Sequence, residues 1–244
     1  MAIYDITPPI TPNLAVWPGD TPPSRQVLCD MKAGANITLS TLHATVHLGA
    51  HADGPNHYGA DAPAIDRRPL DFYLGPCLVV RVDVPRGTRV TVGQFEAGLR
   101  KISDVSNIGA AGATGPSPRP FGLPTRSPSA WKGEGERLPP RVLIATGTYP
   151  DSTRFHEDFA ALEPALIDAL HDCGVRLIGI DTPSVDLFTS KELPAHGRFL
   201  ANDMAILEGL VLRDVPPRMY ELIALPLPLV GFDASPVRAV LREP

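Results

Sequence analysis

Two short segments decide the fold class: Arg141-Val-Leu-Ile-Ala145 and Val175-Arg-Leu-Ile-Gly-Ile180. Both are rich in β-branched and aliphatic residues, which is typical of interior strands. Between them, apolar residues recur at spacings of three and four, as on one face of a helix, at Phe159, Leu162, Leu166, Leu170 and Cys173. Gly174 then provides a natural end for the helix. This part of the chain therefore predicts the order strand, helix, strand.

Further strands are predicted on both sides of this unit, at Cys77–Val84, Tyr220–Leu225 and Val237–Arg242. The fold class is therefore mixed α/β with more strand than helix. From Ser106 to Pro140, roughly half of the residues are Gly, Pro or Ser and no apolar period survives, which predicts a loop insertion. We expect either a mobile surface loop or, alternatively, a lid or a contact with a partner subunit. A length of 244 residues with 43% apolar residues suits one domain spanning 1–244.

Charge and composition exclude several classes of protein. A net charge of −5 with scattered Lys and Arg residues lacks the basic surface of a nucleic-acid-binding protein. The N-terminal residues do not resemble a signal peptide, and no apolar run is long enough to span a bilayer, so we expect a cytoplasmic protein without a membrane partner. Cys29, Cys77 and Cys173 are an odd number and widely spaced, which predicts reduced thiols.

One segment has the composition of a metal site: His47-Leu-Gly-Ala-His51-Ala-Asp53-Gly-Pro-Asn-His57. A straight strand would place His47 and His51 about 13 Å apart, whereas the donor atoms of one metal lie about 3–4 Å apart. A helix is disfavoured by the β-branched residues before His47 and by the Gly and Pro residues after it. We therefore predict a strand to about His47, followed by a Gly-assisted turn or bulge that wraps around a metal.

This segment, continued to Tyr58, resembles the signature His-x-Gly-(Thr or Ala)-His-x-Asp-x-Pro-x-His of the cyclase-like metal-dependent hydrolases. Ala50 is similar to the kynurenine formamidase branch, as are the segments 16–21, 205–212 and 225–242. The resemblance covers nearly the whole chain except the insertion. It implies a swivelling β/β/α domain and a homodimer or larger homo-oligomer. Gly54, Gly197 and the insertion depart from the family pattern, and the insertion puts access to the pocket in doubt.

The resemblance also implies a role for seven residues. His47, His51 and Asp53 resemble the ligands of a first metal, with Asp53 bridging to a second. His196 resembles the histidine of the second metal, and Glu208 the carboxylate that contacts both. His57 resembles the proton donor and acceptor, and Trp17 an aromatic residue that contacts the substrate. Nitrogen and oxygen donors without thiolate suit two zinc ions and would also accept manganese.

The implied reaction is hydrolysis of N-formyl-L-kynurenine to L-kynurenine and formate, as in tryptophan degradation. Three alternatives stay open: a cyclic-amide hydrolase of the isatin hydrolase type, an inactive binding module, and a serine hydrolase, for which no Gly-x-Ser-x-Gly motif is present. Two further predictions are structural. Asp233 and Ser235 should form a hydrogen-bonded turn. His43 should lie in the core or behind the metal ligands, and His156 and His171 receive no role.

Overall fold

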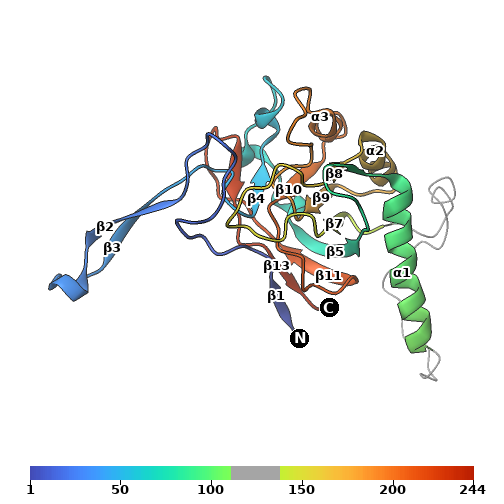
Figure 1. Cartoon of the computed structure of the whole chain (residues 1–244), viewed down its shortest axis with the longest axis horizontal. Helices are drawn as coiled ribbons and strands as arrows, with labels where there is room; N and C mark the ends of the chain where they lie inside the picture. The colour runs from blue at the N-terminus through green and yellow to red at the C-terminus, as the bar shows by residue number, and fades with distance from the viewer. Residues whose placement is uncertain (111–137) are drawn as a thin grey trace.

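The computed structural model describes residues 1–110 and 138–244. Within these residues a nine-stranded sheet has the order β1-β13-β11-β5-β7-β9-β10-β4-β12 (Figure 1). Its strands are β1 (Ile3–Asp5), β4 (His51–Asp53), β5 (Leu74–Arg81), β7 (Arg141–Ala145), β9 (Leu177–Ile180), β10 (Ala205–Glu208), β11 (Met219–Ile223), β12 (Ala234–Pro236) and β13 (Val240–Arg242). The predicted fold class, mixed α/β and rich in strands, is confirmed.

The four central strands β5, β7, β9 and β10 are parallel, and the outer strands pair antiparallel. Successive residues of the central strands enter two different apolar cores, as side-chain alternation requires. Val142 and Ile144, for example, pack with the helices, whereas Leu143 and Ala145 pack on the opposite face. Burial on both faces explains why these segments have nearly continuous apolar sequences.

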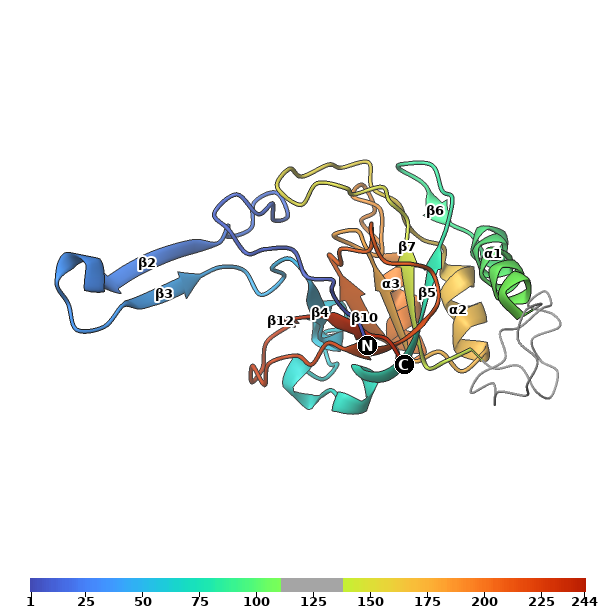
Figure 2. The ribbon, with the colours of Figure 1, turned by 90° about the horizontal axis from the view of Figure 1, so that it is seen from below.

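Three helices accompany the sheet: α1 (Val92–Ala110), α2 (Pro164–Asp172) and α3 (Pro194–Ala201). In Figure 2, α1 and α2 cover one side of the central strands. Helix α1 starts with a capping box, because Thr91 and Gln94 each accept a hydrogen bond from the other's backbone N–H. Helices α2 and α3 both start with proline, which is favourable at the first helical position. A short parallel pair, β6 (Arg89–Val90) and β8 (Ala161–Leu162), precedes α1 and α2.

Several predicted boundaries were wrong. The loop insertion was predicted from residue 106, but α1 continues to Ala110. Its earlier turns are anchored in the core by Phe95, Leu99 and Ile102, and this anchoring outweighs the weak helix propensity of the Ser- and Gly-containing end. The predicted loop residues 111–137 lie outside the described residues. At the other end of the insertion, Leu138 is buried in the core.

The strand predicted to reach about His47 ends at His43 instead. Strands β2 (Ser24–Cys29) and β3 (Leu39–His43) form a separate two-stranded hairpin that projects from the body, which we call the arm (Figure 2). His43 is exposed on this arm, so its predicted position in the core or behind the metal ligands was wrong. The chain is irregular from residue 44 to 50 and then enters the main sheet as β4.

Two predictions from composition can be compared directly with the structure. Cys29, Cys77 and Cys173 are free thiols, as predicted. Among the described residues, no helix has both the length and the apolar character needed to cross a membrane.

Candidate metal centre

The centre is built on β4 at the point where it pairs with β10. His51 lies directly opposite Glu208 in this antiparallel pair, and such cross-strand neighbours have adjacent side chains. Asp53 is two residues after His51 and therefore points to the same face, while Ala52 between them enters the core. The strand itself thus places two potential ligands together, and its neighbour adds a third.

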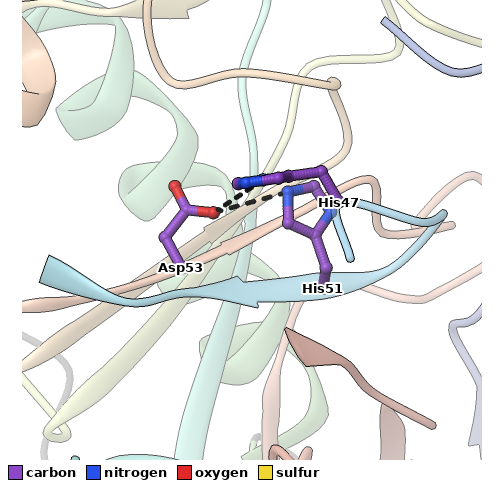
Figure 3. Close-up of side chains that lie close together, drawn as sticks. All are labelled: His47, His51 and Asp53. Atoms are coloured by element: carbon purple, nitrogen blue, oxygen red, sulfur yellow. Dashed lines mark ion pairs between the residues drawn. The ribbon is translucent and has the colours of Figure 1, made fainter. Parts of the chain in front are cut away.

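The bend predicted between His47 and His51 is present. Gly49 has a φ of +57°, a conformation that favours glycine, and it turns the chain into β4. The Thr45 hydroxyl accepts a hydrogen bond from the His47 N–H at 3.2 Å, which stabilises the turn before it. As a result, the side chains of His47, His51 and Asp53 point toward one another (Figure 3).

Each carboxylate oxygen of Asp53 faces a different set of imidazoles. Oδ1 lies 3.3 Å from Nδ1 of His47 and 3.5 Å from Nε2 of His51, whereas Oδ2 lies 3.6 Å from Nε2 of His196. Glu208 spans the same two sides, with Oε2 3.4 Å from Nε2 of His51 and Oε1 3.8 Å from Nε2 of His196. These separations match those between donor atoms that share a metal ion with bonds near 2.1 Å.

The buried donor atoms of this group suit a bound cation. Both Asp53 oxygens and Nε2 of His51 are buried and have no hydrogen-bond partner. Buried polar atoms of this kind are costly unless another group satisfies them, and a carboxylate with no partner is especially costly. Divalent ions bound between the two carboxylates and the imidazoles would satisfy all three atoms. His47, His51 and Asp53 form one group of donor atoms that can hold a metal, and Asp53, His57 and His196 form another.

Groups behind the imidazoles fix their orientation. Nδ1 of His51 lies 2.9 Å from the carbonyl oxygen of Gly49, and Nδ1 of His196 lies 2.9 Å from Oδ2 of Asp186. Asp186 is fully buried and also accepts hydrogen bonds from the N–H groups of Ala195 and His196 at the start of α3. Such partners hold a histidine ring so that its other nitrogen faces the metal.

Asp233 lies at the open side of the centre. Its Oδ2 is 3.0 Å from Nε2 of His47 and 3.5 Å from Nδ1 of His57. Asp233 and Ser235 were predicted to form a hydrogen-bonded turn rather than to act in catalysis, but Ala234–Pro236 is strand β12, which pairs with β4 and brings the Asp233 carboxylate to the histidines. Ser235 lies within this strand, and its hydroxyl accepts a hydrogen bond from the N–H of Leu227.

The protonation of the centre follows from its charges. Burial lowers the pKa of His47, but the Asp53 and Asp233 carboxylates outweigh this effect and raise it to about 9. Burial likewise opposes protonation of His196, but Asp186 and Asp53 raise its pKa to about 10. Without a cation, two protons thus compensate the carboxylates. The His57 side chain is 36% exposed. Its partial burial lowers its pKa by more than the nearby Asp53 and Glu208 carboxylates raise it, which favours a neutral imidazole near pH 7.

A cavity of about 700 Å³ opens from the centre. Six of the seven predicted residues line it: Trp17, His47, His51, His57, His196 and Glu208. The indole of Trp17 packs against Phe155 and Phe188, with ring centroids 5.5 and 5.1 Å away, and it stays 38% exposed. The structure thus brings the five predicted metal ligands and His57 together, and Trp17 lies in the wall of the same cavity.

Sequence reasoning missed Asp186 altogether. The signal that would have found it is its place just after β9, because ligands of α/β sheets gather at the carboxyl ends of parallel strands. Its partner His196 is ten residues further along the chain, and only the fold of the segment between them makes the contact.

Comparisons with known proteins agree with this geometry. Residues 4–111 match the family Cyclase, described as "Putative cyclase". The chain has the cyclase-like fold. It is similar over 100% of its length to a potential metal-dependent hydrolase with cyclase activity, covering 99% of that chain at 25% identity and a TM-score of 0.69. A cyclase structure aligns over 99% of this chain and 88% of its own, with 15% identity and a TM-score of 0.75.

Isatin hydrolase A from Ralstonia solanacearum is a third similar structure. It aligns over 98% of this chain and 91% of its own, with 18% identity and a TM-score of 0.71. At this identity the likeness concerns the fold alone. Together, the comparisons relate the chain to metal-dependent hydrolases of the cyclase type.

Proposed function

We propose that this chain is a hydrolase that binds two divalent cations and opens an aryl formamide, with N-formyl-L-kynurenine as the substrate. The observation that carries the proposal is the buried Asp53 carboxylate, whose two oxygens lack hydrogen-bond partners and face different imidazoles. A carboxylate in this position suits a bridge between two cations. We assign zinc first, because imidazole and carboxylate donors without thiolate suit it, and manganese second.

The proposed ligands divide between two sites. The first cation would be held by Nδ1 of His47, Nε2 of His51 and Oδ1 of Asp53. The second would be held by Nε2 of His196 and Oδ2 of Asp53, with Glu208 contributing an oxygen to each. Oε1 of Glu208 accepts a hydrogen bond from the backbone N–H of Val185 at 2.7 Å, which fixes the direction of this carboxylate.

The chemistry needs both the cations and a proton carrier. Bound divalent cations supply acidification of water and stabilisation of negative charge on the carbonyl oxygen. His57 is placed to move the proton: its pKa is lowered by burial, so the neutral ring can accept a proton from the attacking water. The same ring then donates that proton to the aryl nitrogen as the C–N bond breaks, releasing formate and the free amine.

The substrate class rests on the cavity and on the resemblance. Trp17 and Phe155 line the cavity, with Phe188 packed against the indole, and they give it an aromatic wall that suits an aryl group. A second candidate is a cyclic amide of the isatin type, which is favoured by the structural likeness to isatin hydrolase A. The two candidates share the ligand set and differ in the shape of the substrate.

Hydrolysis of both substrates by the purified protein tests the proposal. We expect turnover of N-formyl-L-kynurenine that is abolished by a chelator and restored by zinc or manganese, with isatin opened much more slowly. Preferential opening of isatin would move the assignment to the second candidate. A fully metal-loaded protein that hydrolyses neither amide would contradict the proposal.

We also propose that the protein forms a homodimer through the arm. All residues from 24 to 43 are exposed or half-exposed, and an isolated two-stranded hairpin has little stability in water. Six large apolar side chains on it are 47% to 62% exposed: Val27, Leu28, Met31, Ile37, Leu39 and Leu42. A second exposed apolar segment, Leu225–Phe232, carries no charge and lies on the side from which the arm projects (Figure 2).

A second copy of the chain fits these two surfaces. In a twofold dimer, the arm of each copy would cover the 225–232 segment of the other, so both apolar surfaces would be buried twice. The arm and this segment together contain 28 residues, which matches the roughly 20–30 residues per side of a stable interface.

A further inference from the structure

The cavity extends along the carboxyl edge of the parallel strands. Four strands in the order β5-β7-β9-β10 end at this edge, and each delivers a residue to the cavity wall: Arg81, Gly147, Asp181 and Glu208. Arg81 is the last residue of β5 and Glu208 the last of β10. Since neighbouring strands are about 4.8 Å apart, the backbones of these two residues are separated by roughly 14 Å. The cavity therefore has a metal end and a distant second end.

Two guanidinium groups mark the second end. Nη2 of Arg81 donates to the carbonyl oxygens of Leu212 and Arg213 at 3.0 and 2.9 Å. Arg213 in turn donates to the carbonyl oxygen of Pro150, and all four residues line the cavity. Arg81 thus joins the end of β5 to the loop after β10, and Arg213 joins that loop to the loop after β7.

The charge of these two arginines is not compensated by the protein. Among the described residues, neither Arg81 nor Arg213 forms an ion pair with a carboxylate, and both donate hydrogen bonds to neutral carbonyl groups. By contrast, Arg68, Arg86, Arg89, Arg176, Arg198, Arg218 and Arg238 each pair with an acidic side chain. Asp181 also lines the cavity, but its oxygens accept hydrogen bonds from Thr146 and Gly147. Two arginines that line one cavity wall without a carboxylate partner favour an anionic ligand, and arginine suits a carboxylate in particular.

We infer that Arg81 and Arg213 form a carboxylate-binding subsite, which holds the acidic end of the substrate while its amide lies at the metal centre. This inference rests on the proposed function and narrows its substrate class to aryl amides that carry a carboxylate at the opposite end. Binding at both ends would orient the reacting carbonyl group. The subsite would also favour such a substrate over a neutral cyclic amide, which has no carboxylate for the two arginines to bind.

The test compares two formamides on the zinc-loaded enzyme. N-formyl-L-kynurenine carries the carboxylate, and N-formylkynurenamine keeps the aryl formamide and the amine but lacks it. We expect wild type to prefer the first substrate, and Arg213→Gln and Arg81→Gln each to lower the ratio of the two kcat/KM values by about 10- to 100-fold, mainly through KM. This range corresponds to the loss of a hydrogen bond between charged groups.

Arg176→Gln is the matched control, because Arg176 is exposed and precedes β9 at the opposite edge of the sheet. It should leave the ratio unchanged. An unchanged ratio in Arg213→Gln would overturn the inference, and since Arg213 is exposed this variant should fold even if Arg81→Gln does not.

A binding experiment separates failure of the subsite from failure of the proposed function. If the metal-loaded wild type hydrolyses neither formamide, the proposed function is wrong, and the subsite is tested with 4-phenylbutanoate and the neutral 4-phenylbutanol by calorimetry. Weaker binding of the carboxylate alone by Arg213→Gln would support the subsite. Equal binding of the carboxylate by wild type and Arg213→Gln would overturn it.

Discussion

Replacing Asp186 by Asn should weaken one of the two proposed cation sites and spare the other. Asp186 is the carboxylate behind His196, with its Oδ2 2.9 Å from Nδ1 of the ring, and it also pairs with Arg89 at 2.8 Å. An amide of the same shape keeps the packing but loses the charge that makes the imidazole a stronger ligand. Loss of such a partner typically lowers metal affinity 10- to 100-fold, or about 1.4–2.7 kcal/mol.

The assay is competition for zinc with a chromophoric chelator, followed by metal analysis at limiting zinc. The variant should bind zinc with wild-type affinity at the site of His47 and His51. Its affinity should fall only at the site of His196, so that this ion is absent at limiting zinc. Asp168→Asn is the control. Asp168 lies on α2 and accepts a hydrogen bond from Arg198, which is on α3 like His196, but it does not contact His196 itself. Wild-type affinity of Asp186→Asn for both ions would show that Asp186 does not support the His196 site, as would an equal loss of affinity in the control.

Three further predictions follow from the same geometry. His57→Ala should keep two cations and lower kcat by about 10²- to 10⁴-fold, and loss of metal would instead make His57 a ligand. The pKa values of His47 and His196 are raised to about 9 and 10 in the folded apoprotein, so the stability they contribute is fully present below about pH 6.5 and is lost as the pH rises through 9 to 10. Metal binding at pH 7.5 must therefore displace about two protons, which calorimetry in buffers of different ionisation enthalpy would measure, and a binding enthalpy that does not depend on the buffer would contradict this. Finally, Leu28→Asp with Leu42→Asp should convert the proposed dimer to a monomer in light scattering, and a monomeric wild type would exclude the arm as a dimer contact.

The local part of the metal centre was predictable from sequence. His51 and Asp53 are two residues apart, which predicts that their side chains lie on the same face of a strand. The length of a straight strand between His47 and His51 is too great for one metal, which predicts the bend that Gly49 makes. These inferences succeed because they depend on backbone geometry over a few residues. The parallel strands were predictable for a related reason, since burial on both faces gives segments such as 141–145 an apolar sequence of their own.

The parts that failed depend on contacts between distant segments. Asp233 is 186 residues from His47 and reaches it only because β12 pairs with β4. Its local sequence predicts a turn, and nothing within it indicates the histidine that it contacts. Helix α1 shows the opposite case, in which three core residues keep the helix going through residues of low propensity. Strand β3 stops four residues before His47 because the arm leaves the body there, which periodicity does not reveal.

The most direct test of the account is the metal content of wild type and of Asp53→Ala, measured by mass spectrometry after equilibration with zinc and dialysis. Asp53 is the residue that joins the two proposed sites, and its oxygens are buried without other partners. We predict two ions per wild-type chain and, for the variant, loss of both bound zinc and activity toward N-formyl-L-kynurenine. A wild type that retains no zinc, or an Asp53→Ala variant with two ions and full activity, would contradict this prediction.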